Sequence, residues 1–146
     1  MTEDPEGETA ELLEHVLLPV ANEEDALRTA KALEPYQPTR VTALHVVEKG
    51  EGVPDKTPVE QSKEVAEASY ASVRSVFPNA DEHTAYGRDI VGSILEAAEE
   101  IDASAIAYRA RSGGRLMQFL SGDLSLKLVT ESDRPVIALP REDAHE

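Results

Sequence analysis

Five short apolar runs, separated by longer amphipathic or polar stretches, constrain this chain more than any other feature. Runs of this length are typical of strands buried on both faces, and the stretches between them have helical spacing. The alternation predicts an α/β domain with an open parallel five-stranded sheet and helices on both faces. The predicted strands are residues 15–20, 40–47, 83–86, 103–108 and 135–139, and charged neighbours place 83–86 at a sheet edge.

Capping residues define the helices between these strands. Asn22 is a predicted N-cap for a helix over 23–34, which Pro35 ends. Thr57 opens the next helix with capping-box spacing, and Asp89 caps the third. The last helix is expected to begin near Gly122 and to run to about residue 132.

The chain of 146 residues is predicted to form one domain over residues 15–140. Residues 1–14 are acidic and aperiodic, so we expect a flexible tail there, and a short tail over 141–146. The start has no basic region typical of a signal peptide, and the apolar runs are too short to span a membrane, which favours a cytoplasmic protein. The absence of cysteine excludes disulfides, thiolate zinc sites and a cysteine nucleophile.

The formal net charge of −15 argues against general affinity for nucleic acid or for an anionic membrane. Lysine is scarce and carboxylates are abundant, which is typical of a halophilic protein with an acidic surface. An acidic mesophilic protein is the alternative. Melting temperature against potassium chloride distinguishes the two, since a halophilic protein is not most stable in dilute buffer.

Ligands of open parallel sheets bind at the carboxyl ends of the strands, where the strand order reverses. We therefore expect a crevice formed by the ends of the first two strands and by the loop after the fourth. Its candidate residues are Pro19, Val20, Ala21, Val46, Arg109, Arg111, Ser112, Gly113, Gly114, Ser121, Gly122 and Asp123.

Residues 15–140 resemble the universal stress protein family in four segments: HVLLPVANEEDALRTAKAL, VTALHVV, GRDIVGSILEAAEEIDASAIAY and SGDLSLKLVTESDRPVIALP. The resemblance implies a Rossmann-like fold of the adenine-nucleotide-binding type, with strand order 3-2-1-4-5. Some members of the family bind ATP and others do not. The resemblance also implies a homodimer along the last strand, through Pro135, Val136, Ile137, Ala138 and Leu139.

The members that bind ATP share an Asp after the first strand, where this chain has Ala21. They also share a loop with the pattern glycine, two residues, glycine, nine residues, glycine and Ser or Thr. Arg109 and Ser112 stand at the first two glycine positions, Gly122 matches the third, and Asp123 replaces the Ser or Thr. A shifted alignment on residues 111–113 makes the spacing to Gly122 too long. ATP is therefore a possible ligand, but we do not expect this chain to bind ATP in the way that the ATP-binding members of the family do.

Physical chemistry supports the same expectation. A side chain at a glycine position blocks the close approach of backbone to a phosphate, and the Asp123 carboxylate at a helix N-terminus repels a second anion. However, Arg109, Arg111 and Arg115 form the densest positive cluster of the chain, and arginine suits phosphate or carboxylate groups. We favour pairing of these arginines with acids of the same surface or of a dimer mate, and an anionic ligand remains an alternative.

No catalytic or metal-binding set stands out in the sequence. His15, His45 and His83 lie on or beside strands, with no second ligand at short spacing. No nucleophile elbow and no Walker loop occur. Two hypotheses remain. The first is a non-enzymatic regulatory or stress-response homodimer, with or without an unidentified protein partner. The second is a nucleotide-binding module with an altered, arginine-rich phosphate loop.

Overall fold

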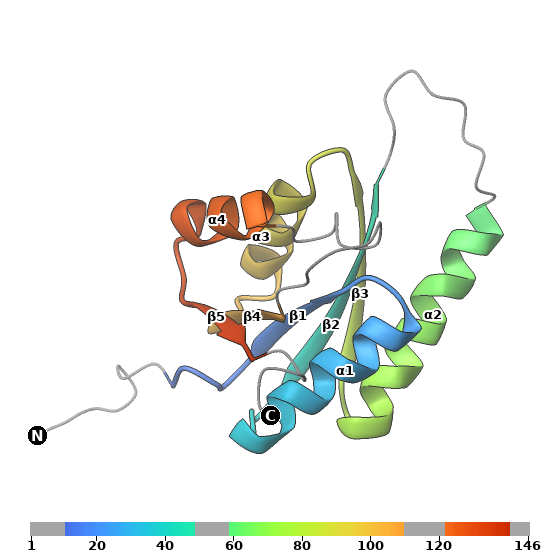
Figure 1. The fold of residues 1–146 in the computed structure, drawn as a ribbon, viewed down its shortest axis with the longest axis horizontal. Coiled ribbons are helices and arrows are strands. Elements are labelled where there is room, and N and C mark those ends of the chain that lie inside the picture. Colours follow the sequence, from blue (N-terminus) through green and yellow to red (C-terminus); the bar gives the residue numbers. More distant parts are fainter. Residues whose placement is uncertain (1–10, 49–58, 110–121, 141–146) are drawn as a thin grey trace, which may run out of the picture.

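The computed structural model describes residues 11–48, 59–109 and 122–140 and contains one parallel five-stranded sheet with strand order β3-β2-β1-β4-β5 (Figure 1). This confirms the predicted fold class. The strands are β1 (Val16–Val20), β2 (Val41–Glu48), β3 (Asp81–Gly87), β4 (Ala105–Arg109) and β5 (Val136–Leu139). The helices are α1 (Glu23–Leu33), α2 (Val59–Val76), α3 (Ile90–Glu100) and α4 (Gly122–Glu131), and a 3-10 turn, η1 (Glu34–Tyr36), follows α1.

The sheet separates two apolar layers. Alternate residues of β1 point to opposite faces, so Leu18 packs under α1 and α2, whereas Leu17 packs under α3 and α4. Val73 of α2 completes the first layer, and Ile94 of α3 and Leu128 of α4 complete the second. Figure 1 shows α1 and α2 on one side of the sheet and α3 and α4 on the other. This burial on both faces explains why the central strands read as continuous apolar runs.

The caps of α1 and α3 lie at the predicted residues. The side chain of Asn22 accepts a hydrogen bond of 2.8 Å from the backbone N–H of Asp25. Asp89 occupies the N-cap of α3, although its side chain makes no capping hydrogen bond. As predicted, α1 ends before Pro35, at Leu33, and the chain continues into η1, where the carbonyl of Glu34 accepts a hydrogen bond from the N–H of Gln37. The predicted cap at Thr57 lies outside the described residues.

The fold includes residues 11–14, which the sequence had assigned to a flexible tail. The carbonyl of Leu13 accepts a hydrogen bond of 2.8 Å from the N–H of Thr39, and the Leu13 side chain packs against the core. The hydroxyl of Ser104 donates to the carbonyl of Leu12 at 2.9 Å. These contacts make Leu12 and Leu13 part of the fold. Residues 1–10 and 141–146 lie outside the described part of the chain.

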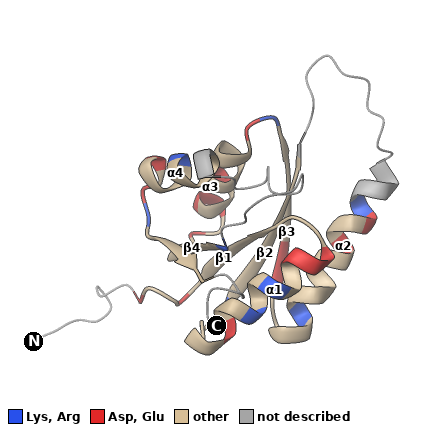
Figure 2. Ribbon diagram, in the orientation of Figure 1, with Lys and Arg blue, Asp and Glu red and all other residues tan. Residues whose placement is uncertain are grey.

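The two edges of the sheet differ in charge. As predicted, β3 is an edge strand. It begins with two acids that are both paired: Asp81 with Arg40 at 2.8 Å, and Glu82 with Arg74 at 3.0 Å. The other edge strand, β5, has the sequence VIAL and carries no charge (Figure 2). Among the described helices, none is long and apolar enough to cross a membrane.

Candidate functional site

The carboxyl ends of β1 and β4 both contact the start of α1 through Asp25. Along the β1–β4 pair, Val16 is opposite Ala105 and Leu17 is opposite Ile106. Val20 is the last residue of β1 and Arg109 the last of β4. Two strand ends and one helix N-terminus therefore meet in the region where the sequence predicts a crevice.

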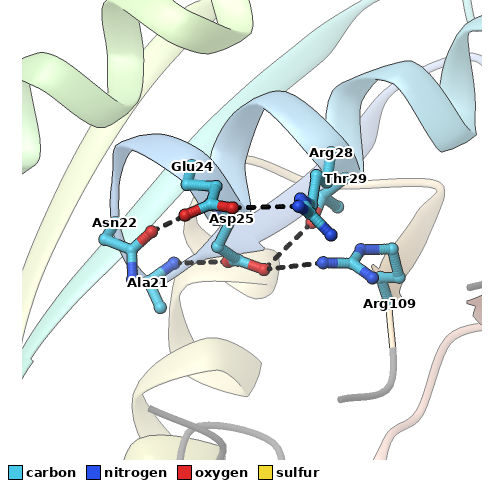
Figure 3. Close-up of polar contacts among 7 residues, drawn as sticks. All are labelled: Ala21, Asn22, Glu24, Asp25, Arg28, Thr29 and Arg109. Atoms are coloured by element: carbon cyan, nitrogen blue, oxygen red, sulfur yellow. Dashed lines mark hydrogen bonds and ion pairs between the residues drawn. The ribbon is translucent and has the colours of Figure 1, made fainter. Parts of the chain in front are cut away.

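The carboxylate of Asp25, in the first turn of α1, lies next to the end of β1. Its Oδ2 atom accepts a hydrogen bond of 2.8 Å from the backbone N–H of Ala21, while its own N–H donates to Asn22 (Figure 3). This reciprocal arrangement resembles a capping box, shifted back by one residue. The residue just after β1 is Ala21, which has no carboxylate, but the carboxylate of Asp25 lies next to its backbone.

Arg109 reaches the same carboxylate from β4. Its Nη2 atom lies 3.6 Å from Oδ1 of Asp25, and the two side chains are only 10% and 7% exposed (Figure 3). The hydroxyl of Thr29 donates to the same Oδ1 atom at 3.4 Å. Charges removed from water attract each other more strongly and cost more to separate. The Asp25–Arg109 pair therefore ties the end of β4 to the first turn of α1.

An exposed ion pair on the same helix offers a contrast. Arg28 and Glu24 lie one turn apart on α1 and are joined at 2.9 Å, but their side chains are 48% and 74% exposed. Water screens such a pair, so its contribution to stability is small. Of the two pairs in Figure 3, only Asp25–Arg109 is buried where the sheet meets the helix.

His45 of β2 lies opposite Val20, the last residue of β1. The alternation along β2 places it on the face covered by α1 and α2, because Ala43 packs there and Leu44 and Val46 pack on the other face. The ring is buried, and this burial lowers the pKa of His45, although a hydrogen bond with the Val20 carbonyl acts in the opposite direction. The imidazole is therefore neutral at pH 7.

The structure brings some of the predicted site residues together and separates others. Val20 packs under α1 and α2, whereas Val46 packs on the opposite face, so these two side chains do not share a surface. Pro19 is buried within β1, and Ala21 is half-buried. Gly122 and Asp123 open α4, but their side-chain surroundings lie outside the described part. The predicted residues Arg111, Ser112, Gly113, Gly114 and Ser121 also lie outside it.

One prediction about this region was wrong. The sequence placed the end of the fourth strand at Tyr108 and assigned Arg109 to the following loop, whereas the structure places Arg109 in β4, paired with Leu139 of β5. A charged residue does not suggest the end of a buried strand, yet Asp25 supplies a counter-charge on the α1 side. Arg109 is therefore a buried residue of the fold.

Sequence reasoning also missed the role of Asp25, which it treated only as one of three acids favourable to a helix dipole. A pattern was available: Asp25 follows the N-cap Asn22 by three residues, the spacing of a capping box. The partner across the sheet, Arg109, could not be identified from local spacing.

Carboxylates stand at the starts of two helices, Asp25 at α1 and Asp89 at α3, and Nζ of Lys127 lies 4.0 Å from Oδ1 of Asp89. A carboxylate near a helix start interacts favourably with the helix dipole and repels an incoming anion. Within residues 11–48, 59–109 and 122–140, no group of three or more metal-ligating side chains occurs.

Comparisons with known proteins agree with this fold. Residues 13–140 match the model of the universal stress protein family. A search of curated proteins gave no match.

Solved structures of low sequence identity share the fold. A universal stress protein from Archaeoglobus fulgidus in complex with dAMP is 20% identical, with a TM-score of 0.64 over 88% of this chain and 99% of that one. An Arabidopsis thaliana family protein with AMP bound is 14% identical, with a TM-score of 0.60 over 91% and 95% of the two chains. A universal stress protein in complex with cAMP is 12% identical, with a TM-score of 0.61 over 88% and 98%.

Proposed function

Because this chain belongs to the universal stress protein family, we propose that it is a non-catalytic regulatory protein of the stress response. It acts as a homodimer through β5 and does not bind ATP in the way of its nucleotide-binding relatives. The observation that carries this proposal is the buried Asp25–Arg109 ion pair at the carboxyl ends of β1 and β4.

The ion pair opposes a phosphate in two ways. The carboxylate of Asp25 repels an anion near the start of α1, and Arg109 is already engaged by that carboxylate. A phosphate that drew Arg109 away would break the buried Asp25–Arg109 pair, at a cost of about 3 kcal/mol or more. A cost of that size weakens binding by roughly a hundredfold or more.

The homodimer is supported by the chemistry of β5. The strand pairs with β4 on one side and, among the described residues, with no strand on the other. An uncharged edge strand is a ready site for pairing with another strand. The net charge of −15 supports a halophilic source, and the acidic start of the chain, without the basic region of a signal peptide, favours the cytoplasm. An unidentified protein partner would convey its regulatory effect.

A second candidate function, nucleotide binding, is favoured by the structural neighbours in complex with dAMP, cAMP and AMP. In that case Arg109 would contact the phosphate from β4, with the arginine-rich segment after it contributing further cations. The fold accommodates adenine nucleotides in those proteins, so the difference between the two candidates lies in the side chains at the crevice.

Isothermal titration calorimetry in concentrated potassium chloride separates the two candidates. The wild-type protein is titrated with ATP and magnesium, and separately with AMP and with cAMP. We expect no saturable binding of any of the three. Submicromolar ATP binding that disappears in Arg109→Gln, but persists in the exposed control Arg28→Gln, would establish the second candidate and overturn the first.

A further inference from the structure

A single peptide group joins the buried histidine of β2 to the ion pair at the carboxyl end of the sheet. The carbonyl of this group, at Val20, accepts a hydrogen bond from the ring of His45. Its N–H, at Ala21, donates to Oδ2 of Asp25 at 2.8 Å, and the other carboxylate oxygen of Asp25 lies 3.6 Å from Arg109. Because a peptide group is planar and stiff, a rotation that moves its carbonyl also moves its N–H. His45 and Asp25 therefore hold the two sides of one rigid unit.

The ring of His45 lacks a partner for one of its nitrogens. The residue is 8% exposed, and its Nδ1 atom is buried with no hydrogen-bond partner. A neutral imidazole tolerates this arrangement, because its unprotonated nitrogen is only an acceptor. A protonated imidazole donates from both nitrogens, and a buried donor without an acceptor costs about 1–3 kcal/mol, or more when it is charged. The surroundings of His45 therefore favour the neutral ring.

The acids in the layer under α1 and α2 are already paired. Asp25 of α1 is paired with Arg109 of β4. Glu82 of β3 is paired with Arg74 of α2. The phenol of Tyr70 donates to a backbone carbonyl of β3, and burial raises its pKa to about 12, so it stays neutral. Besides the exposed side chains on the outer surfaces of α1 and α2, the described charged or titratable groups on this side of the sheet are Asp25, Tyr70, Arg74, Glu82, Tyr86 and Arg109. Within the described part of the chain, no unpaired acid of this layer is thus available to a protonated Nδ1.

The other two described histidines differ from His45 in this respect. Nε2 of His15 lies 2.7 Å from the hydroxyl of Thr42, and a hydroxyl can accept a hydrogen bond as well as donate one. Nε2 of His83 lies 3.4 Å from Oε1 of Glu100, so protonation there forms an ion pair. Of the three, His45 alone has a buried ring nitrogen without a hydrogen-bond partner. Protonation is therefore expected to disturb the fold most at His45.

We propose that the peptide group between Val20 and Ala21 is a pH-sensitive switch, which acid releases by protonating His45. The charged ring leaves its buried position for water, and the carbonyl of Val20 loses its donor. The N–H of Ala21 then moves away from Asp25, which loosens the carboxyl end of β1. This inference rests on the proposed function in one respect, since Asp25 is the group assigned there to oppose a phosphate. Histidine changes its charge between about pH 5 and pH 8, a range that suits the response to an acid stress.

Nuclear magnetic resonance of the isotope-labelled full chain, without nucleotide, tests the switch in the wild type. The pH is lowered from about 7.5 to about 5 at constant potassium chloride concentration. The ring nitrogen shifts of His45 report its protonation, and the amide shift of Ala21 reports the hydrogen bond to Asp25. We expect the two signals to change with the same midpoint, below about pH 6.5. Below that midpoint, the protection of the Ala21 amide from exchange should fall roughly tenfold per pH unit, after correction for the intrinsic pH dependence of exchange.

Two matched variants identify the histidine that is responsible. His45→Gln keeps an amide donor for the carbonyl of Val20 but does not titrate, so the Ala21 amide should be insensitive to pH over the same range. The control His15→Gln removes another buried histidine, at the amino end of the sheet, and should leave the response of Ala21 as in the wild type. Circular dichroism melting verifies that both variants fold. If His45→Gln does not fold, the agreement of the two midpoints in the wild type decides by itself.

Three results would overturn the switch. The first is an imidazole of His45 that stays neutral down to about pH 5. The second is an Ala21 amide that does not respond while His45 titrates, and the third is a response of Ala21 that persists in His45→Gln. The proposed function fails in a different experiment, since saturable ATP binding in calorimetry would contradict it and leave these nucleotide-free measurements unchanged.

Discussion

The two ends of the β1–β4 pair are held by different chemistry. At the amino end, neutral groups connect the strands: the N–H of His15 donates to the hydroxyl of Ser104 at 2.8 Å, and the N–H of Ser104 donates to the carbonyl of His15 at 2.7 Å. At the carboxyl end, the connection is the buried ion pair between Asp25 and Arg109.

The difference shows where this fold uses charge. Neutral hydrogen bonds satisfy the backbone groups of the amino end at little desolvation cost. Buried charges are costly, and well-packed apolar residues in their place are often equally stable or more so. Stability alone therefore does not account for the Asp25–Arg109 pair. Its position, at the end of the sheet where ligands of this fold class bind, is consistent with the proposal that the pair opposes phosphate binding there.

The largest effect is expected when the charged end is broken. Arg109→Leu leaves the buried carboxylate of Asp25 without this guanidinium, and we expect a loss of about 3–5 kcal/mol in the free energy of unfolding, measured by urea titration. Arg28→Leu, in the exposed pair of the same helix, should cost less than about 1 kcal/mol.

A double variant tests whether charge compensation is the reason. Asp25→Asn combined with Arg109→Leu removes both charges but keeps an oxygen for the N–H of Ala21. This variant should be more stable than Arg109→Leu alone. If the double variant is less stable than the single one, the pair is not held together by its charges.

A smaller effect is expected at the neutral end. Nε2 of His15 and the hydroxyl of Thr42 are joined at 2.7 Å in a buried position. Thr42→Val keeps the shape of the side chain but leaves the imidazole nitrogen unsatisfied, and we expect a loss of about 1–3 kcal/mol. Thr130→Val, on the exposed side of α4, should change stability by no more than about 0.5 kcal/mol. Equal losses of unfolding free energy for Thr42→Val and Thr130→Val would mean that the buried His15–Thr42 hydrogen bond contributes no more to stability than an exposed one.

The smallest effect is expected from the pH dependence of stability, which involves His15 at the amino end of the sheet and His45 near the carboxyl end. Burial, followed by the charge of Arg40, lowers the pKa of His15 in the folded protein, and burial lowers that of His45. The unfolded chain therefore binds protons more readily, so this contribution is constant above about pH 6.5 and stability decreases as the pH falls below that value.

For each histidine the slope is at most about 1.4 kcal/mol per pH unit. The measurement is the melting temperature between pH 7.5 and pH 5 in wild type, His15→Gln and His45→Gln, at roughly matched ionic strength. Each variant should show a shallower decrease than the wild type. A wild-type curve as shallow as those of both variants would contradict the lowered pKa values.

Much of the fold could be predicted because its determinants are local. The apolar runs of β1 and β4 are short and uninterrupted, the cap at Asn22 precedes three acids, and α3 has a clear apolar stripe. Each of these patterns depends on residues close together in the sequence. The strand order came from the resemblance to a family, and the structure confirms it.

The site was harder to predict because its contacts are not local. Asp25 and Arg109 are 84 positions apart in the sequence, and nothing near either residue indicates the other. The strand end was misplaced for the same reason, since a buried arginine is acceptable only with a partner that the local sequence does not reveal. Val20 and Val46 were assigned to one crevice because each ends a strand, but the pleat turns them to opposite faces.

The charged start of β3 has a consequence for how many copies of this chain can join. Asp81 and Glu82 occupy one outer strand of the sheet with paired charges, while β5 at the opposite side has none. Open-ended growth into a fibre needs two edge strands that can pair, one on each side of every subunit. A sheet with only one uncharged edge strand can pair through that strand once, so the proposed homodimer through β5 would not extend into a fibre.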